Sequence, residues 1–409
     1  MENFFSFNQP YVPIQYYDNI RNYKYSSSDA SITYKYIMSP LCNFLVTKFP
    51  IWLAPNVITI SGFFLNIVYF IVENYYTKFK GGYIPSWACY FCAFCYLLYQ
   101  ILDNIDGKQA RRTNSSSALG LLVDHGTDSC TTFFITCCLG AILALMTIHQ
   151  YILLWIMIIV PFYLNNWEQY ITGKMDLPLI NGINEGTYII VFLEVLSGIK
   201  GQNFLIETNL SIFGFNVQLN TFMCFIACWA GIFFGVLSVI KVILYQNRDI
   251  VISALIDIFP FIFFLLTFAS VVYLTDSYFV SEYPQFVIVA FGFQFAKILG
   301  ILQLAHLTKC RYNPYTFTFV IPNLTLIIHS IIYYTRNENK IFNLNVDNLI
   351  FIYFVLNFFI WLHFAYFCSE ELCNILNINR FSLKKNIGEK KYESLKELEE
   401  KEKSDNFGL

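Results

Sequence analysis

Apolar runs of about 20 residues recur along this chain, and they constrain its fold more than any other feature. A helix of that length crosses the hydrocarbon core of a bilayer, which is ~30 Å thick. Composition agrees, because 56% of the 409 residues are hydrophobic and only 13% are charged. A typical soluble domain has about 25% charged residues. The sequence therefore predicts an all-α, polytopic integral membrane protein.

Turn-forming residues divide the apolar runs into about ten predicted transmembrane helices. Breaks occur at Gly81-Gly82, Pro85, Gly173 and Pro284, among others. Most Lys and Arg residues occur in the two termini and the even-numbered loops, so these are predicted to face the cytosol. The predicted helices cover residues 56–75, 86–102, 118–146, 150–171, 185–199, 218–244, 250–275, 284–307, 314–334 and 347–368.

Four aspartates flank the loop between the second and third predicted helices. Asp103 and Asp106 are three residues apart, and Asp124 and Asp128 are four apart, so each pair shares one helix face. The polar stretch 113–117 favours a turn that makes the two helices antiparallel and brings the four carboxylates together.

Such a cluster of acids is costly in a membrane protein. Each aspartate at the centre of a membrane helix costs ~2.5–3.5 kcal/mol, before any mutual repulsion. Cations are therefore required, and hard ions such as Mg²⁺ prefer carboxylate oxygens. The pattern predicts a site for two divalent ions, an arrangement suited to displacement at phosphorus.

Neighbouring residues fit the same chemistry. Gly107, Ala110 and Gly120 leave room for a nucleotide diphosphate, although small residues in membrane helices usually serve helix packing. Arg111 offers a planar positive group suited to phosphate. His125 lies between two of the aspartates and is a candidate to accept the proton of an attacking hydroxyl. A lone membrane histidine is more often a packing residue.

The aspartates and their neighbours together resemble the signature of the CDP-alcohol phosphotransferase family. The match is Asp103-x-x-Asp106-Gly107-x-x-Ala110-Arg111, followed after eight residues by Gly120, Asp124 and Asp128. The surrounding DGKQARRTNSSS is similar to the eukaryotic choline and ethanolamine phosphotransferases. One departure is Leu121-Leu122, where that branch usually carries an acidic residue. Further similar segments are Lys24–Ser28, Pro50–Thr59, Trp167–Gly173, Asn181–Gly186 and Ala305–Lys309.

This resemblance implies an activity and a set of partners. The family transfers a substituted phosphate from a CDP-alcohol to a second alcohol and releases CMP. The implied donor is CDP-choline or CDP-ethanolamine, and the implied acceptor is diacylglycerol from the surrounding membrane lipids. The resemblance further implies a homodimer in the endoplasmic reticulum or Golgi membrane, with the active site facing the cytosol. The net charge of −2 gives no indication of a nucleic-acid partner.

The resemblance also implies residue roles. Asp103, Asp106, Asp124 and Asp128 become ligands of two Mg²⁺ or Mn²⁺ ions, and the catalytic base is either His125 or Asp128. The residues implied to surround the CDP-alcohol are Asn56, Gly107, Ala110, Arg111, Gly120 and, as a weaker candidate, Glu185.

The predicted organisation has four parts. Residues 1–50 form a cytosolic segment with an interfacial helix, and residues 51–200 form the catalytic core. Residues 201–375 supply later transmembrane helices, a candidate region for lipid access and dimer contacts. Residues 376–409 form a charged cytosolic tail, dense in Lys and Glu.

Two other functions are compatible with a polytopic chain. An ion-coupled transporter is expected to have acids scattered over several helices near the bilayer midplane, whereas here they cluster on two consecutive helices. A phosphatidyltransferase that uses CDP-diacylglycerol as donor has the same signature, but such relatives typically have about six membrane spans.

Overall fold

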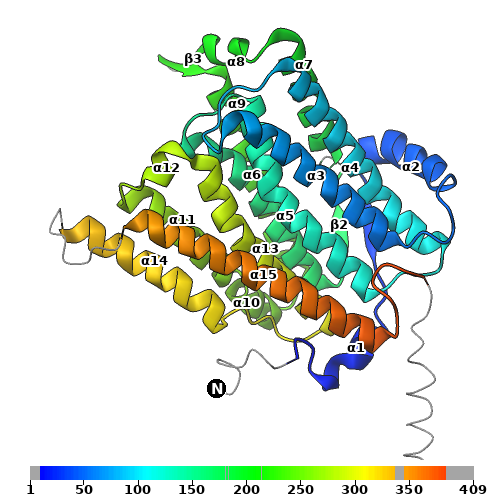
Figure 1. The fold of residues 1–409 in the computed structure, drawn as a ribbon. Helices are drawn as coiled ribbons and strands as arrows, with labels where there is room; N and C mark the ends of the chain where they lie inside the picture. Colours follow the sequence, from blue (N-terminus) through cyan, green and yellow to red (C-terminus); the bar gives the residue numbers. More distant parts are fainter. Residues whose placement is uncertain (1–9, 180, 183, 213, 337–344, 384–409) are drawn as a thin grey trace, which may run out of the picture.

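Nearly all of the described chain is helical, and many of the long helices run in roughly the same direction (Figure 1). The computed structural model describes residues 10–179, 181–182, 184–212, 214–336 and 345–383. Most of the predicted charged tail lies outside these ranges. Two short strand pairs occur within them: β1 (Ser27–Asp29) is parallel to β2 (Met175–Leu177), and β3 (Asn209–Ile212) is antiparallel to β4 (Phe215–Gln218). The predicted all-α fold is confirmed.

Each predicted apolar segment forms a helix. In the described ranges, eight helical segments are long and apolar enough to cross a membrane. The long helices are α3 (Pro55–Thr77), α4 (Ser86–Arg112), α5 (Ala118–Ile142), α6 (Ile148–Thr172), α7 (Asn184–Lys200), α9 (Leu219–Tyr245), α10 (Arg248–Ile256), α11 (Phe259–Leu274), α13 (Pro284–Thr308), α14 (Phe317–Arg336) and α15 (Val346–Leu376). The short ones are η1 (Ile14–Tyr16), α1 (Tyr17–Arg21), η2 (Tyr34–Met38), α2 (Ser39–Val46), α8 (Asn203–Glu207) and α12 (Tyr278–Glu282).

Among these eight candidate transmembrane segments, α10 and α11 form one segment, Arg248–Leu274. Helices α5 and α7 are not among the eight. Helix α7 has only 17 residues. Helix α5 has the necessary length, but its aspartates, histidine and many Ser and Thr residues lower its apolarity. These two helices and the eight candidates together correspond to the ten predicted segments.

Helix α13 lies at the centre of the bundle. It packs against α5, α6 and α15, and 94% of its most apolar 18-residue stretch is buried inside the protein. By contrast, the corresponding stretches are only 28% buried in α3 and α9 and 22% buried in α15. Large apolar side chains such as Phe64, Trp229 and Phe359 are exposed on these outer helices. An apolar surface of this kind is stable when lipid tails cover it, so the protein is an integral membrane protein.

The two ends of the bundle differ. In Figure 1, α1 lies at the bottom, whereas β3 and α8 lie at the top. Helix α1 is held by the last residues of α13 and α15: Asn19 donates to the carbonyl of Thr308 at 2.6 Å, and Arg21 donates to that of Ile375 at 3.2 Å. We call this end of the bundle the α1 end.

Candidate active site and metal centre

A tight helical hairpin positions the aspartates. Helix α4 continues ten residues beyond the predicted limit of 102 and ends at Arg112, with Thr113 as its C-cap, and Asn114 adopts a left-handed conformation with φ of 54°. The hydroxyl of Ser117 then accepts a hydrogen bond from the backbone N–H of Gly120 at 3.3 Å, which caps the start of α5. The predicted turn over 113–117 is therefore present.

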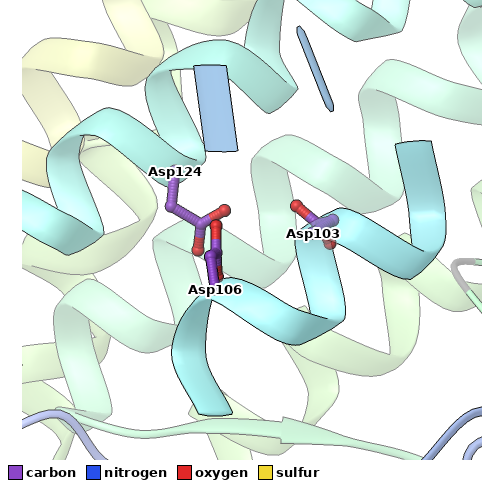
Figure 2. A group of neighbouring side chains, drawn as sticks. All are labelled: Asp103, Asp106 and Asp124. Carbon is purple, nitrogen blue, oxygen red and sulfur yellow. The ribbon is translucent and has the colours of Figure 1, made fainter. Parts of the chain in front are cut away.

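The hairpin brings three carboxylates together (Figure 2). One carboxylate oxygen each from Asp103, Asp106 and Asp124 lies within 4.8 Å of the other two. Asp128, one turn after Asp124 on α5, is within electrostatic range of the other aspartates. All four predicted ligands therefore gather at one place, although Asp128 stands outside the tight group of three.

Neutral side chains orient two of these acids. Helix α3 packs against both α4 and α5, and its Thr59 hydroxyl donates a hydrogen bond to the Asp106 carboxylate. From α4, the Tyr99 hydroxyl donates to the Asp128 carboxylate at 2.6 Å. Thr59 and Tyr99 are thus supports of the site that the sequence pattern alone did not single out.

The donor set fits a divalent cation. Asp106 is only 7% exposed, and the other three carboxylates are half-buried. None of the ion pairs among the described residues involves them. Carboxylates at this separation repel one another unless a cation lies between them. Oxygen donors alone, with no sulfur or imidazole in the group of three, are the ligands that Mg²⁺ and Mn²⁺ prefer.

Four of the predicted donor-site residues lie on this hairpin, and Asn56 lies beside it. The Arg111 guanidinium lies over Gly107, where an added Cβ would be 3.6 Å from it, and is within electrostatic range of Asp106. At Gly120, an added Cβ would be 3.8 Å from the Asn56 amide oxygen. The half-buried Ala110 lies one residue before Arg111 near the end of α4.

Asn56 has a second contact that the sequence did not indicate. Its amide nitrogen donates to the backbone carbonyl of Arg380 at 2.9 Å. The segment that follows α15 therefore reaches back to the start of α3, beside the hairpin.

His125 points toward a different set of partners from its aspartate neighbours. Its Nδ1 is 2.8 Å from the amide oxygen of Asn166 on α6. That oxygen also accepts a hydrogen bond from Gln303 on α13, while the Asn166 amide nitrogen donates to the carbonyl of Phe162 at 2.6 Å. The amide orientation leaves its oxygen facing His125, so Nδ1 carries the hydrogen and Nε2 is the basic nitrogen.

Glu185 is fully engaged by the protein. One carboxylate oxygen accepts from the backbone N–H and the hydroxyl of Thr33, at 3.2 and 3.0 Å. The other accepts from the backbone N–H of Asn181 at 2.9 Å. Within the described residues, Glu185 makes no contact with the four aspartates. It joins the N-terminal segment to the chain between α6 and α7.

The N-terminal segment reaches the candidate site. Tyr25 is within electrostatic range of Asp103, Asp124 and Arg111. The Tyr23 hydroxyl is 3.4 Å from Nε2 of His306, and burial raises the pKa of this tyrosine. The segment Lys24–Ser28, noted above only for its family resemblance, thus comes close enough to the aspartates for Tyr25 to interact with them electrostatically.

The comparisons with known proteins agree with this geometry. Residues 52–165, which include the whole hairpin and Asn56, match the family model described as CDP-alcohol phosphatidyltransferase. A Dictyostelium discoideum protein described as an uncharacterized CDP-alcohol phosphatidyltransferase class-I family protein is 31% identical over 383 residues, covering 92% of this chain and 97% of the relative.

Relatives with named activities are also similar. Choline/ethanolaminephosphotransferase 1 of Arabidopsis thaliana is 31% identical over 300 residues, covering 70% of this chain and 76% of that protein. Cholinephosphotransferase 1 of Danio rerio is 27% identical over 382 residues, covering 89% and 93%.

The membrane-embedded helices and the family match define an integral membrane transferase of phospholipid biosynthesis. The chain belongs to the CDP-alcohol phosphatidyltransferase family.

Proposed function

We propose that this chain transfers phosphocholine, phosphoethanolamine or both from the CDP-alcohol to diacylglycerol, forming phosphatidylcholine or phosphatidylethanolamine and releasing CMP. The observation that carries the proposal is the convergence of Asp103, Asp106 and Asp124 in a member of this family. The activities in the names of the Arabidopsis and Danio relatives support the choice of substrates.

In this proposal the four aspartates would hold two Mg²⁺ or Mn²⁺ ions, whose positive charge would offset the negative charge of the donor pyrophosphate and of the departing CMP. The protein's own contribution is to present the carboxylates in a fixed geometry. Thr59 and Tyr99 hold Asp106 and Asp128 by one hydrogen bond each, so little reorganisation is needed when the donor binds.

Proton transfer is assigned to His125. The acceptor oxygen attacks the phosphorus that bears the choline or ethanolamine group, and the bond from that phosphorus to the CMP oxygen breaks. The hydroxyl proton passes to Nε2 of His125, which is available because Nδ1 is bonded to Asn166. Asp128 is the alternative base, although its carboxylate already accepts a hydrogen bond from Tyr99.

The donor is proposed to bind against the small-residue faces of the hairpin. Gly107, Ala110 and Gly120 admit the diphosphate, and Arg111 and Asn56 contact it at the ends of α4 and α3. The contacts of Glu185 with Thr33 and Asn181 support a positioning role, in which it fixes the N-terminal segment beside the donor.

Cellular placement follows from the chemistry of the substrates. CDP-alcohols are water-soluble and are expected to reach the α1 end from the cytosol, whereas diacylglycerol enters sideways from the bilayer. We propose that the protein resides in the membrane of the endoplasmic reticulum or Golgi and forms a homodimer through its later helices.

A competition assay tests the proposed function. Purified protein receives CDP-choline and CDP-ethanolamine together, with diacylglycerol and saturating Mg²⁺, and the labelled lipids and CMP are measured. Formation of either phospholipid with equal release of CMP is expected. Absence of both products at saturating substrates would contradict the proposal.

The Asp124→Asn variant tests the role of the aspartates. Turnover should fall to background even at saturating Mg²⁺, because one ligand of the proposed centre is lost. Removing one charge also relieves like-charge repulsion, so thermal stability without metal should be equal or higher. The exposed Asp276 provides the control, since Asp276→Asn should change neither property. Retained turnover in Asp124→Asn would refute the metal assignment.

A further inference from the structure

A cavity of about 280 Å³ lies away from the aspartates. Its walls are the junction of α10 and α11 on one side and residues 311–315, between α13 and α14, on the other. These residues follow Thr308, to which α1 is bonded, so the cavity opens at the α1 end. None of the elements that line it supplies an aspartate of the candidate metal centre.

Asp257 is the most unusual residue of this cavity. It is 7% exposed, yet its carboxylate has no hydrogen-bond or ion-pair partner within the described residues. Its backbone is fixed, because its N–H donates to Ser253 and Ala254 and its carbonyl accepts from the Tyr163 hydroxyl at 3.2 Å. Its carboxylate oxygens are not among the fully enclosed unpartnered atoms of the described residues, so they open into the cavity, where a cationic partner from outside the protein can bind them.

Arg311 supplies the opposite charge at the outer edge. It is exposed, and although it is within electrostatic range of Asp257 it forms no ion pair with it. The two charged groups therefore face the same cavity without neutralising each other directly. A ligand that is only cationic would be repelled by Arg311, and one that is only anionic by Asp257.

Aromatic side chains line the space between these charges. Tyr312 is 4% exposed, and its hydroxyl is held by Tyr163 at 3.4 Å and by the carbonyl of Ile298 at 3.3 Å. Tyr315 is 43% exposed and borders the opening. Tyrosine faces beside a carboxylate are a recurrent way to bind an ammonium group, quaternary ammonium included.

We infer that this cavity binds a phosphate ester that carries an ammonium group, with the ammonium at Asp257 and the phosphate at Arg311. Two sources share this chemistry: the head group of a zwitterionic phospholipid and a free phospho-amino-alcohol. The cavity adjoins the start of the apolar segment Arg248–Leu274. The inference concerns binding only and does not depend on the proposed reaction.

Direct binding measurements test the inference. For the lipid source, the full-length protein in nanodiscs of phosphatidylglycerol with a minor share of phosphatidylcholine is analysed for retained lipid by native mass spectrometry. For the free source, phosphocholine is titrated calorimetrically into the same protein in a nonionic detergent. The wild-type chain should retain phosphatidylcholine, bind phosphocholine, or do both.

Two variants remove the charges of the cavity. Asp257→Asn and Arg311→Gln should each weaken binding roughly tenfold or more, the loss expected for one charge-assisted contact. Asp249→Asn and Arg248→Gln are matched controls, because both residues are exposed at the start of α10 and neither lines the cavity. These controls should bind as the wild type does.

The same titrations in Asp124→Asn separate this cavity from the aspartate site, because binding should persist there. If the two cavity variants lose the retained phosphatidylcholine, the ligand of the cavity is a phospholipid head group. If they lose the calorimetric signal, the ligand is the free phosphate ester. Equal binding by Asp257→Asn or Arg311→Gln in both measurements, or complete loss in Asp124→Asn, would overturn the inference.

Discussion

Neutral polar side chains determine how the charged and reactive residues of this site are held. Thr59, Tyr99 and Asn166 each bond one candidate functional residue, and each comes from a helix packed beside it. Such partners fix orientation and tautomer, and their loss typically costs 10–100-fold in activity at comparable sites. The proposed chemistry of this protein therefore depends on residues that do not themselves react.

Asn166 offers a sharp test of the assignment of His125. Replacing the base itself, in His125→Ala, should lower kcat by roughly 10²-fold or more. Asn166→Leu should lower kcat by roughly tenfold, because the imidazole loses the acceptor that fixes its tautomer. The KM for the CDP-alcohol should change little in either variant. Steady-state kinetics with purified protein measure both constants.

The neighbouring residue provides the control. Asn165 faces α9, where its amide oxygen accepts from Ser238 at 2.7 Å, so Asn165→Leu should leave kcat unchanged. A rise in KM without a fall in kcat for Asn166→Leu would assign His125 and Asn166 to donor binding instead.

The aspartates could be predicted from sequence, whereas their supports could not. Charged residues within apolar helices are conspicuous, and their spacing places each pair on one helix face. Asn166 and Gln303 also interrupt apolar runs, but Asn166 meets His125 across 41 residues of chain, and Gln303 meets Asn166 across 137. Nothing local indicates that pairing. The family resemblance implies Glu185 as a donor contact, and this stays a prediction; its hydrogen bonds to Thr33 span 152 residues of chain, so local sequence did not indicate them either.

At the scale of whole helices, the close packing of α9 against α6 depends on glycine. Gly231 and Gly235 on α9 are one turn apart and face α6. A Cβ at Gly231 would be 2.5 Å from the Cα of Met157, whereas the close contacts of one at Gly235 would be with the Val160 and Leu164 side chains, at 2.8 and 2.9 Å, and the nearest backbone atom would be 3.6 Å away. Small residues at this spacing let membrane helices approach closely.

This difference predicts a graded loss of stability. Gly231→Ala should destabilise the protein by about 1–3 kcal/mol, since the backbone of α6 has to move. Gly235→Ala should cost less, because side-chain ends can rotate away. Thermal unfolding in detergent, followed by size-exclusion recovery, measures both effects.

Gly186 is the matched control for these variants. It lies in the first turn of α7, and an added Cβ would meet nothing within 4 Å. Gly186→Ala should therefore leave stability unchanged or raise it by about 0.5–1 kcal/mol through helix propensity. Equal stability of Gly231→Ala and the wild type would show that α6 and α9 are not packed as described.

Element ends were harder to predict than the elements. The apolar run of α4 stops near residue 102, but the helix continues to Arg112 because Lys108 and Arg112 are bonded to residues of α2 and the chain after it. These contacts stabilise a polar helical extension that hydropathy does not reveal. The extension matters, since it carries Asp103 and Asp106.

On the scale of the whole molecule, the N-terminal segment joins parts of the protein that are far apart in sequence. The backbone N–H groups of Tyr11 and Val12 both donate to the Glu371 carboxylate, at 2.9 and 3.0 Å. Further along, Ser28 donates to Asp176 at 2.6 Å, where β1 pairs with β2. Between these two attachments the segment passes the aspartates at Tyr25.

Glu371 is therefore predicted to control how firmly this segment is attached. Glu371→Ala removes two charge-assisted hydrogen bonds, so the segment should open more often and trypsin should cleave at Arg21 and Lys24 roughly tenfold faster. Turnover should fall in parallel, because Tyr25 is carried away from the aspartates. Timed proteolysis with mass spectrometry locates the cuts.

Glu282 gives a control at another surface of the protein, where its carboxylate forms an exposed ion pair with Lys80 at 3.2 Å. Exposed pairs of this kind contribute little to stability, so Glu282→Ala should be cleaved as slowly as the wild type. Faster cleavage with unchanged turnover in Glu371→Ala would mean that the segment is a structural tie only. Unchanged cleavage would contradict the prediction, because the bonds of Asn19 and Arg21 and the strand pairing at Ser28 would then be sufficient to hold the segment without Glu371.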